Sequence, residues 1–336
     1  MPTVLLAGLG AVGTRAARQL ADTTSIDRLL VADRHTERAE MVADALGERV
    51  EALEWTSELE LPEGVDAIAS ANAGGSDAVI ADRALSAGVS FASVSDDTRV
   101  LHDLLARDQE ARGHGVAIAA GCGLAPGLAD VLARHAADAF ETVEEVSVAR
   151  AGAAGAASAA TMRRARHDPA LEWHDGQLVE TRRRVGAELV WFPDPIGALE
   201  CELVANGVEL LASSFTSAGR VTVRYAEPPE ERPVLRWLRP PMAGSGWGAA
   251  RVEVWGSRGR ARDTVVYGVI EQTSTAAGTV LAITAAGLAG AIDVLESPRP
   301  TGVHGLATLA APIPFLGELA HRGVRAAVFE GVPVAT

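Results

Sequence analysis

The chain has 336 residues, of which 48% are hydrophobic and 22% charged, so it can bury a large core and is not a disordered protein. Its formal charge of −14 gives no general attraction for nucleic acid or for an anionic membrane surface, which favours small metabolites as partners. All 30 basic residues are arginines, which excludes Schiff-base enzymes, lysine general bases and the P-loop lysine.

The sequence indicates a reducing compartment. Cys122 and Cys201 are too few for a disulfide framework or a cysteine-rich zinc site, and we expect no metal centre. The amino end has no basic, signal-like segment and enters a strand pattern directly. The most apolar stretch, residues 280–292, is shorter than a bilayer span. We therefore expect a cytoplasmic protein without membrane or nucleic-acid partners.

The first part of the chain alternates short apolar runs with helical patterns, which is typical of a parallel sheet with crossover helices. The predicted strands are 3–7, 28–32, 50–53, 65–70, 90–94 and 116–120. The predicted helices are 11–21, 36–47, 76–88 and 98–112. Gly47 and Gly88 are typical helix ends, and Ser76 is a typical N-cap. This rhythm predicts an α/β fold with a doubly wound parallel sheet of the Rossmann type.

The pattern changes after Gly127. Beyond a helix that reaches Ala139, apolar and polar positions alternate, which predicts an inserted α+β domain of mostly antiparallel strands. These strands are 143–150, 188–192, 199–204, 220–225, 251–255 and 262–270. The last two are joined by GSRGR, which is typical of a hairpin. We expect a long helix over 273–295 and a final helix from Pro314 that packs on the first domain.

The strongest motif is GLGAVG, in which Gly8, Gly10 and Gly13 follow a strand and open a helix. The first glycine permits a tight turn, the second lets a diphosphate approach the backbone, and the third lets helix and strand pack closely. Ala11 and Val12 lie at the helix N-terminus, whose free N–H groups stabilise phosphate charge. The motif predicts a dinucleotide site.

The second strand ends at Asp33, 20 residues after Gly13, where an acid is needed to hold the adenosine ribose hydroxyls. A carboxylate about 4 Å from a 2′-phosphate would cost about 4 kcal/mol at an effective dielectric constant of about 20, which disfavours NADP. Arg34 offsets part of that penalty if its guanidinium reaches the phosphate. We expect NAD as the cofactor and keep NADP as the alternative.

Further cofactor candidates follow two later strands, at the edge of the sheet where nucleotide ligands lie. Ala71 and Asn72 belong to the SANAGG segment, and Ser93 begins SVSDD. Asn72 fits a contact to the nicotinamide ribose and a turn residue equally well. We expect all three residues near the nicotinamide half of the cofactor.

Three candidates for the substrate side lie at the same edge. Asp96 and Asp97 would neutralise a substrate ammonium, although paired aspartates before a helix are more often N-cap residues. Cys122 lies between two glycines and would line the hydride-transfer site, but a small buried hydrophobe would look the same in the sequence.

These residues resemble the saccharopine dehydrogenase-like family, which includes saccharopine reductases and lysine 6-dehydrogenases. The resemblance rests on GLGAVG, on VADR ending at Arg34, on FASVSDD, and above all on GCGLAPGLADVLA, which is similar to the family's Gly-x-x-Pro-Gly crossover. Weaker similarity continues at WHDG, WFPDPIGALE and VYGVIEQT. The similarity covers nearly the whole chain and is most specific up to the crossover.

The resemblance implies a division into three parts. They are a dinucleotide-binding domain (1–124), a substrate and dimerisation domain (125–302), and a C-terminal segment (303–336) that returns to the first domain. It also implies reversible hydride transfer at a carbon–nitrogen bond of an amino acid or derived imine, in a homodimer. Relatives carry a Gly-His-x-Glu stretch where this chain has Asn206 and Gly207, so the substrate carries over less well than the fold.

The acid–base group has no clear signature in the second domain. Without lysine, the candidates there are His135, His167, Glu200, Glu202, Glu209 and Tyr267. His167 is favoured because the arginines of MRRARH around it favour a neutral, proton-accepting imidazole. The catalytic candidates are therefore His167, Cys122, Asp96 and Tyr267.

Two further features have open interpretations. Arg163, Arg164 and Arg166, with residues 182–184, would grip a substrate carboxylate or form a solvated surface. The AGAAGAASAA stretch from Ala151 predicts a flap over the substrate or a plain loop.

Together these features predict an NAD(P)-dependent oxidoreductase acting on an amino acid or derived imine. The alternatives are a nucleotide-binding sensor or scaffold without dehydrogenase activity, and a reductase of another double bond in a specialised pathway.

Overall fold

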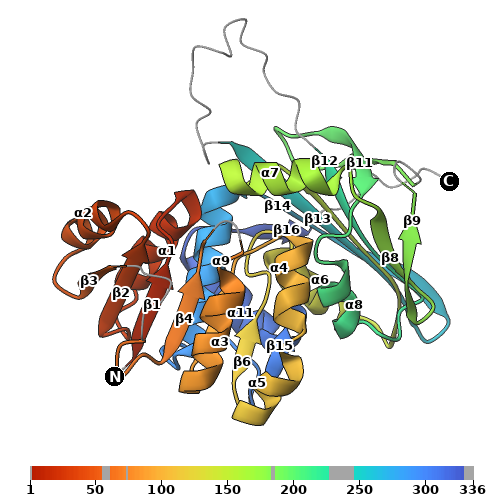
Figure 1. Ribbon diagram of the computed structural model, residues 1–336. Helices are drawn as coiled ribbons and strands as arrows, with labels where there is room; N and C mark the ends of the chain where they lie inside the picture. The colour runs from red at the N-terminus through yellow and green to blue at the C-terminus, as the bar shows by residue number, and fades with distance from the viewer. Residues whose placement is uncertain (1, 55–60, 73–74, 183–185, 227–245, 329–336) are drawn as a thin grey trace, which may run out of the picture.

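The computed structural model describes residues 2–54, 61–72, 75–182, 186–226 and 246–328. These residues form two sheets surrounded by helices (Figure 1). Arg183 and Arg184, two of the predicted substrate-binding arginines, lie outside the described residues.

The first sheet has seven parallel strands among the described residues, in the order β15-β6-β5-β4-β1-β2-β3. They are β1 (Thr3–Ala7), β2 (Arg28–Asp33), β3 (Val50–Glu54), β4 (Ala67–Ser70), β5 (Ser90–Ser93), β6 (Ala117–Ala119) and β15 (Gly302–His304). The inner strands are continuous apolar runs because helices cover both faces of the sheet. The strand order reverses between β1 and β4, which is the point at which sheets of this kind bind ligands. The predicted doubly wound Rossmann sheet is confirmed.

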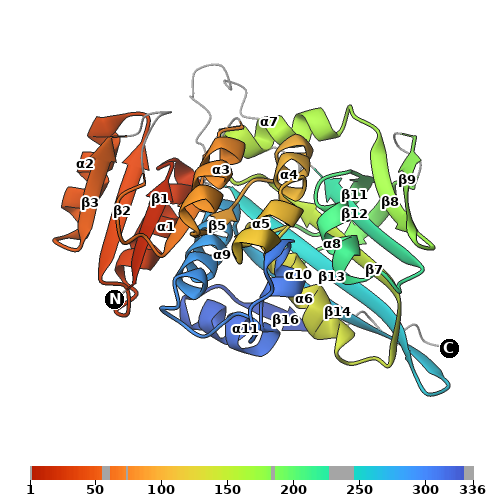
Figure 2. The same ribbon diagram turned by 60° about the horizontal axis from the view of Figure 1, so that its bottom comes forward.

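Helices cover the two faces of this sheet in separate groups (Figure 2). One group is α1 (Ala11–Ala21), α2 (Thr36–Leu46) and α9 (Thr273–Leu288); the other is α3 (Asp77–Ala87), α4 (Thr98–Leu105) and α5 (Asp108–His114). α9 is buried on nearly all sides, in keeping with its mostly small residues and the absence of charged ones. Gly278 allows α9 to approach α1 closely, because a Cβ there would lie 2.8 Å from the Val12 carbonyl oxygen.

The second sheet has nine strands among the described residues, and its main path runs β10-β11-β12-β7-β13-β14-β16. They are β7 (Thr142–Ala151), β8 (Ala170–His174), β9 (Gln177–Thr181), β10 (Glu188–Trp191), β11 (Ala198–Leu203), β12 (Arg220–Ala226), β13 (Trp247–Arg258), β14 (Ala261–Gln272) and β16 (Ala326–Val328). The predicted hairpin is formed by β13 and β14. The prediction of mostly antiparallel strands is confirmed, with the parallel pair β7–β12 as an exception. The strands β8, β9 and β16 were not predicted.

Several predicted helix limits are wrong. The helix predicted over 98–112 is broken at Ala106 and Arg107 into α4 and α5, and the long helix ends at Leu288. The AGAAGAASAA stretch is no plain loop, because β7 ends within it and α7 (Ala156–Ala165) begins there. The remaining helices are α6 (Leu128–Ala137), α8 (Val208–Ser214), α10 (Leu306–Leu309) and α11 (Pro312–His321).

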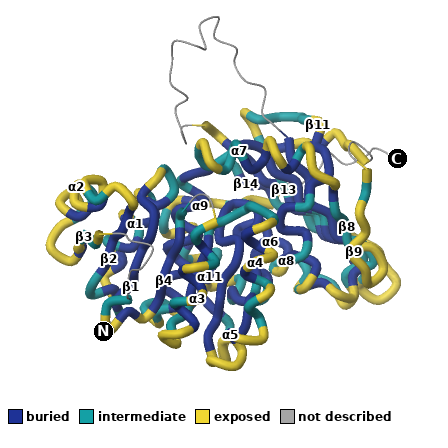
Figure 3. The backbone as a smooth tube through the Cα atoms, in the orientation of Figure 1, coloured by how far each residue is buried: buried dark blue, intermediate teal, exposed yellow. Residues whose placement is uncertain are grey.

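The last described part of the chain contributes to both sheets. β15 extends the first sheet beside β6, and β16 pairs with β14 in the second. Between them, α11 packs near α1, where Arg322 donates to the Gln19 carbonyl oxygen at 3.0 Å. The central strands of both sheets are buried, whereas α2 at the edge is largely exposed (Figure 3).

Candidate active site

A cavity of about 790 Å³ lies at the carboxyl edge of the parallel sheet. Its lining starts at residues 10–12 of the glycine loop, passes the ends of β4 and β5, and reaches Arg150 on β7. α7 covers the cavity with one side of the helix, from Ala156 to Arg164. The volume is typical of small-molecule sites, and the position is the one at which the sequence predicts a ligand.

The three glycines of the loop have different physical requirements. Gly8 has a φ of +90°, and a Cβ there would lie 2.6 Å from Asn72 Oδ1. A Cβ on Gly13 would lie 1.8 Å from the Gly8 carbonyl oxygen, so only glycine lets α1 pack on β1. A Cβ on Gly10 would meet nothing within 4 Å, because this position faces open space.

The glycine loop fits a diphosphate. Gly10 is the N-cap of α1 and has no side chain that could accept a capping hydrogen bond. The N–H groups in the first turn of α1 therefore receive no hydrogen bond acceptor from the N-cap residue. Residues 10–12 line the cavity, and the space beside Gly10 would be filled by any side chain. These are the conditions under which a helix N-terminus binds a phosphate group.

Asp33 joins the end of β2 to the glycine loop. Its Oδ2 accepts a hydrogen bond from the Leu9 N–H at 2.7 Å, and its Oδ1 accepts one from the His35 N–H at 3.0 Å. The guanidinium of Arg38 lies 3.5 Å from Oδ2, while Arg34 is exposed. The cation placed beside the carboxylate is therefore Arg38, whereas the sequence pattern singled out only Arg34.

The candidates after β4 and β5 are placed differently from one another. Ala71 and Asn72 line the cavity, and Asn72 Nδ2 is buried without a hydrogen-bond partner. Ser93 is fully buried beneath the cavity, and its hydroxyl donates to Asp77 at 2.5 Å. Ser70, at the end of β4, donates to the same carboxylate at 2.5 Å. The sequence pattern indicated Ser76 as an N-cap, whereas no role was predicted for Asp77 beside it.

Asp96 lies at the substrate end of the cavity, in contact with Arg150. Arg150 Nη2 donates to Asp96 Oδ2 at 2.9 Å, and Ser158 of α7 donates to the same oxygen at 2.8 Å. Arg150 also donates to the Ala125 carbonyl oxygen, and its guanidinium carbon lies 5.6 Å from the ring centroid of Tyr225. Both side chains of the pair are largely buried, so neither charge is screened by bulk water.

Asp97 is an N-cap, as the alternative interpretation held. Its carboxylate accepts from the Arg99 N–H at 3.0 Å and pairs with Arg164 of α7 at 2.9 Å. Burial acts to raise the pKa of Asp97, but hydrogen bonds from the two arginines outweigh it and hold the pKa below its usual range. One helix of the second domain is thereby attached to the first domain beside the cavity.

Three of the four catalytic candidates lie outside the cavity lining. His167 is exposed after the end of α7. Tyr267, on β14, stacks on His135 of α6 with ring centroids 5.7 Å apart, and burial raises its pKa. Tyr267 packs against the large apolar core to which residues of both sheets contribute.

Cys122 also lies apart from the lining, although the next residues, 123–126, belong to it. Its side chain is fully buried, with Sγ 3.4 Å from the Ala119 carbonyl oxygen. Burial raises the pKa of the Cys122 thiol to about 12, so the sulfur is protonated at neutral pH. This is the environment of a small core residue, and only Asp96 of the four candidates contacts the cavity.

Arg150 and Ser158 were not predicted as site residues. Arg150 carried a usable signal, because it follows Val146 and Val148 on the apolar face of the buried end of the strand. Ser158 carried none, since a serine in an alanine-rich helix is ordinary.

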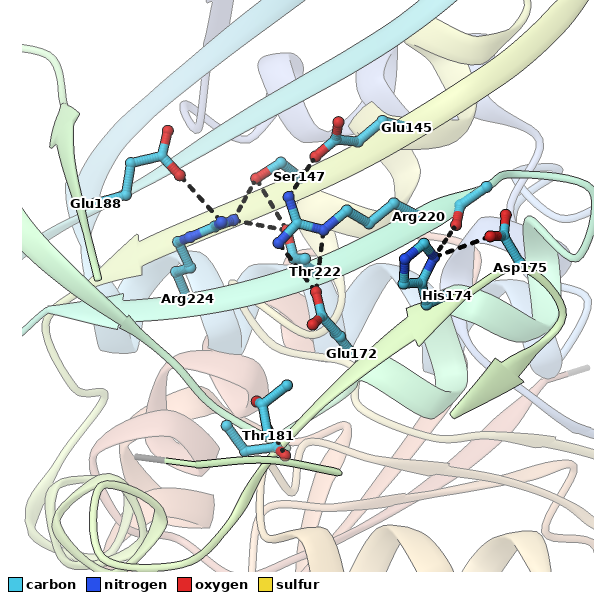
Figure 4. Close-up of polar contacts among 12 residues, drawn as sticks. Glu145, Ser147, Glu172, His174, Asp175, Thr181, Glu188, Arg220, Thr222 and Arg224 are labelled. Atoms are coloured by element: carbon cyan, nitrogen blue, oxygen red, sulfur yellow. Dashed lines mark hydrogen bonds and ion pairs between the residues drawn. The ribbon is translucent and has the colours of Figure 1, made fainter. Parts of the chain in front are cut away.

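Several other charged side chains on the second sheet pair with one another (Figure 4). Arg224 is buried and bonds the Ser147 hydroxyl at 3.0 Å and Glu188 at 3.0 Å. Arg220 pairs with Glu172 at 3.0 Å. None of these residues lines the cavity, so they are not available to a ligand there.

Within the described ranges, no group of three metal-binding side chains comes together. No described helix is both long and apolar enough to cross a membrane.

Comparison with known proteins finds similarity in fold but no match in sequence. No family model and no curated protein matches the sequence. A solved structure of apo saccharopine dehydrogenase (L-Glu forming) from Saccharomyces cerevisiae matches 98% of this chain and 100% of its own, with a TM-score of 0.70 and 12% identity. This chain has the saccharopine dehydrogenase fold.

Two further structures are similar over comparable lengths. C. glutamicum DAP dehydrogenase in complex with DAP matches over 96% of this chain and 99% of its own, with a TM-score of 0.51 and 12% identity. An engineered D-amino acid dehydrogenase bound to NADP+ matches over 96% and 99%, with a TM-score of 0.50 and 13% identity. The fold that the sequence motifs predicted is therefore confirmed at low sequence identity.

Proposed function

We propose that this protein is an NAD(P)-dependent oxidoreductase that transfers hydride at a carbon–nitrogen bond of an amino acid or derived imine. The observation that carries the proposal is the continuity of one cavity. It joins the open glycine position at Gly10 to the buried Asp96–Arg150 pair. A dinucleotide laid across the switch point of the sheet would place its diphosphate at the first end and its nicotinamide toward the second.

The proposed chemistry assigns different tasks to the two ends. When bound, the nicotinamide supplies hydride acceptance or donation. In the oxidation direction, the substrate carbon would lose a hydride to the bound cofactor, and the substrate nitrogen would lose a proton to the Asp96 carboxylate. Asp96 would pair with the substrate ammonium. Arg150 and Ser158 would hold the Asp96 carboxylate in place, and α7 would keep bulk water out of the cavity.

NAD is the preferred cofactor in this proposal. Asp33 is buried at the end of β2, and a 2′-phosphate beside it would meet an unfavourable charge. NADP remains the alternative because Arg38 and Arg34 lie close by, and because one structure with a similar fold is bound to NADP+.

Two measurements test the proposal. Titrating the purified protein with NADH and with NADPH, followed by cofactor fluorescence, tests the site; binding of neither would contradict it. Turnover with a panel of amino acids, keto acids with amines, and cyclic imines then tests the reaction. Asp96→Asn should abolish turnover while leaving NADH affinity within about 3-fold, since only a side chain at the substrate end changes.

A second candidate function is a nucleotide-binding sensor or scaffold. It is favoured by the placement of His167, Tyr267 and Cys122 away from the cavity. Among the lining residues that the structure describes, the ionisable ones are aspartates and arginines only. This candidate predicts tight cofactor binding with no turnover across the panel. Turnover of an unsaturated carbonyl, but of no imine, would instead indicate a reductase of another double bond.

We also propose a cytoplasmic homodimer that assembles through the second sheet. Light scattering should give about twice the chain mass, and the chain mass itself would contradict the dimer.

A further inference from the structure

Asp77 links the ends of two neighbouring strands under the cavity. It is the first residue of α3, and its side chain is turned away from solvent with 3% relative exposure. Its Oδ1 accepts from the Ser70 hydroxyl and its Oδ2 from the Ser93 hydroxyl, each at 2.5 Å. Ser70 ends β4 and Ser93 ends β5, so one carboxylate holds both strand ends.

The two serine hydroxyls extend this link to the cavity wall. Ser70 Oγ accepts from the Asn72 N–H at 3.4 Å, and Ser93 Oγ accepts from the Ser95 N–H at 3.1 Å. Asn72 and Ser95 both line the cavity. Each wall segment is therefore fixed two residues beyond a serine whose orientation is set by Asp77.

Asn72 also contacts the glycine loop. A Cβ on Gly8 would lie 2.6 Å from Asn72 Oδ1, so the Asn72 side chain is pressed against the turn that precedes α1. Its Nδ2 is buried and has no partner, which leaves a donor beside the cavity wall. A displacement of Asn72 would therefore alter the surface of the cavity that a ligand contacts.

The carboxylate is placed at an energetic disadvantage that capping of α3 does not explain. Burial raises the pKa of Asp77, while the hydrogen bonds from Ser70 and Ser93 act in the opposite direction. The N-cap of α3 is Ser76, and no side-chain capping bond is made there. Both oxygens of Asp77 are occupied by the strand ends instead.

The strand order says which half of a dinucleotide this link serves. Asp33 and the glycine loop belong to β1 and β2, on the adenosine side of the switch point. β4 and β5 lie on the other side, where the nicotinamide riboside would rest. We infer that Asp77 is a positioning residue that shapes the nicotinamide half of the cofactor site through Ser70 and Ser93; this inference rests on the proposed function.

A comparison of two ligands tests the inference. ADP carries the adenosine and the diphosphate but lacks the nicotinamide riboside, so it reports on the adenosine half alone. Asp77→Ala should weaken NADH by about 10-fold, because two bonds to a buried carboxylate are lost, and should change the ADP affinity by less than about 2-fold. Affinities come from calorimetry on the full chain, with the thermal midpoint measured beside them.

Two further variants separate positioning from loss of folding. Asp77→Asn can still accept from one serine and donate to the other, so its NADH affinity should lie between those of the unmodified protein and the alanine variant. If Asp77→Ala fails to fold, Ser93→Ala takes its place and should weaken NADH selectively. Asp82→Ala is the matched control, because Asp82 lies on the same helix but pairs with Arg107 at the surface.

The outcomes are distinct. Equal losses for NADH and ADP, or no loss for either, would overturn the inference and leave Asp77 as an ordinary core residue. The same holds if the asparagine variant is as weak as the alanine variant. If the unmodified protein binds neither NADH nor ADP, the proposed function itself fails and the inference falls with it.

Discussion

The two ends of the cavity are formed by different kinds of groups, main-chain groups at one end and side chains at the other. The adenosine end is formed by main-chain groups and one carboxylate. That carboxylate, of Asp33, accepts a hydrogen bond from the Leu9 N–H, only 24 residues away in the sequence. At the substrate end, side chains meet from distant segments, such as Asp96 with Arg150 and the Asp96 carbonyl with Asn206, 54 and 110 residues apart. The first end is local in sequence, and the second forms only when residues on or after strands of both sheets come together.

This difference determines what each end tolerates. A main-chain cradle depends on the absence of side chains, so it is sensitive to added atoms. A cluster of buried charges depends on mutual compensation, so it is sensitive to removed atoms. Substitutions at the two ends should therefore have different signatures in stability and in binding.

The largest effect is expected at Gly13. Its Cβ would lie 1.8 Å from the Gly8 carbonyl oxygen, so Gly13→Ala must displace α1. We expect the unfolding free energy to fall by about 3 kcal/mol and the NADH affinity to fall by about 100-fold. Denaturant unfolding and fluorescence titration measure the two quantities.

Gly10→Ala is the matched comparison. The added Cβ meets nothing within 4 Å and the φ of −71° suits alanine, so the unfolding free energy should stay within about 1 kcal/mol. The NADH affinity should still fall by about 10-fold, because the methyl group occupies the phosphate space. Unchanged NADH binding in this variant would show that no diphosphate lies there.

The next largest effect is expected at Arg150. Arg150→Met leaves Asp96 largely buried without its ion pair, which should lower the unfolding free energy by about 2–3 kcal/mol and abolish turnover. ADP affinity should stay within about 2-fold, since the adenosine end is untouched. Adding Asp96→Asn to this variant should restore part of the stability, and a strictly additive double variant would contradict a coupled pair.

A smaller effect is expected at Asp33. Asp33→Asn removes the charge that opposes a 2′-phosphate and weakens acceptance of ribose hydroxyls, so NADH should lose about 10-fold in affinity and NADPH distinctly less. Titration with both cofactors gives the ratio. Asp44→Asn, at an exposed position on α2, is the control. Equal losses for the two cofactors would argue against the ribose contact.

The smallest effect is expected at Cys122. Its pKa of about 12 lies far above pH 8, so about one thiol in ten thousand is ionised there, and the thiol is buried as well. Iodoacetamide at pH 8 should leave Cys122 unmodified in the folded protein, as read by mass spectrometry, and alkylate it in guanidinium chloride. Cys122→Ala should change turnover by less than about 2-fold; a large loss would return Cys122 to the catalytic candidates.

The same contrast explains what could be predicted from the sequence. The glycine spacing, Asp33 and the first sheet follow from local patterns, and the fold is as expected. Ser93 was expected at the cofactor and instead bonds Asp77 beneath it, because the direction of a side chain at a strand end depends on the neighbouring strand. His167 was predicted as a catalytic residue because arginines flank it in the sequence. Its exposed position follows from where α7 ends.

The unpredicted strands have a related cause. β8 and β9 form a hairpin whose β9 side chains are mostly exposed, so the alternation that reveals a half-buried strand is weak. The parallel pairing of β7 with β12 joins neighbouring strands that are far apart in the sequence, with α7, four further strands and α8 between them along the chain. Neither property is encoded within a single stretch of sequence.

The loop that carries Asp96 and Asp97 has a thermodynamic consequence. It extends from a strand of the first domain, yet Arg150, Ser158 and Arg164 of the second domain hold it. Occupancy at one end of the cavity that displaces this loop must alter affinity at the other end, and the reverse change must be equal in free energy. The two binding equilibria would then be coupled through the contacts of Arg150, Ser158 and Arg164 with this loop. In kinetic measurements, such coupling would be observed as an ordered binding of cofactor and substrate.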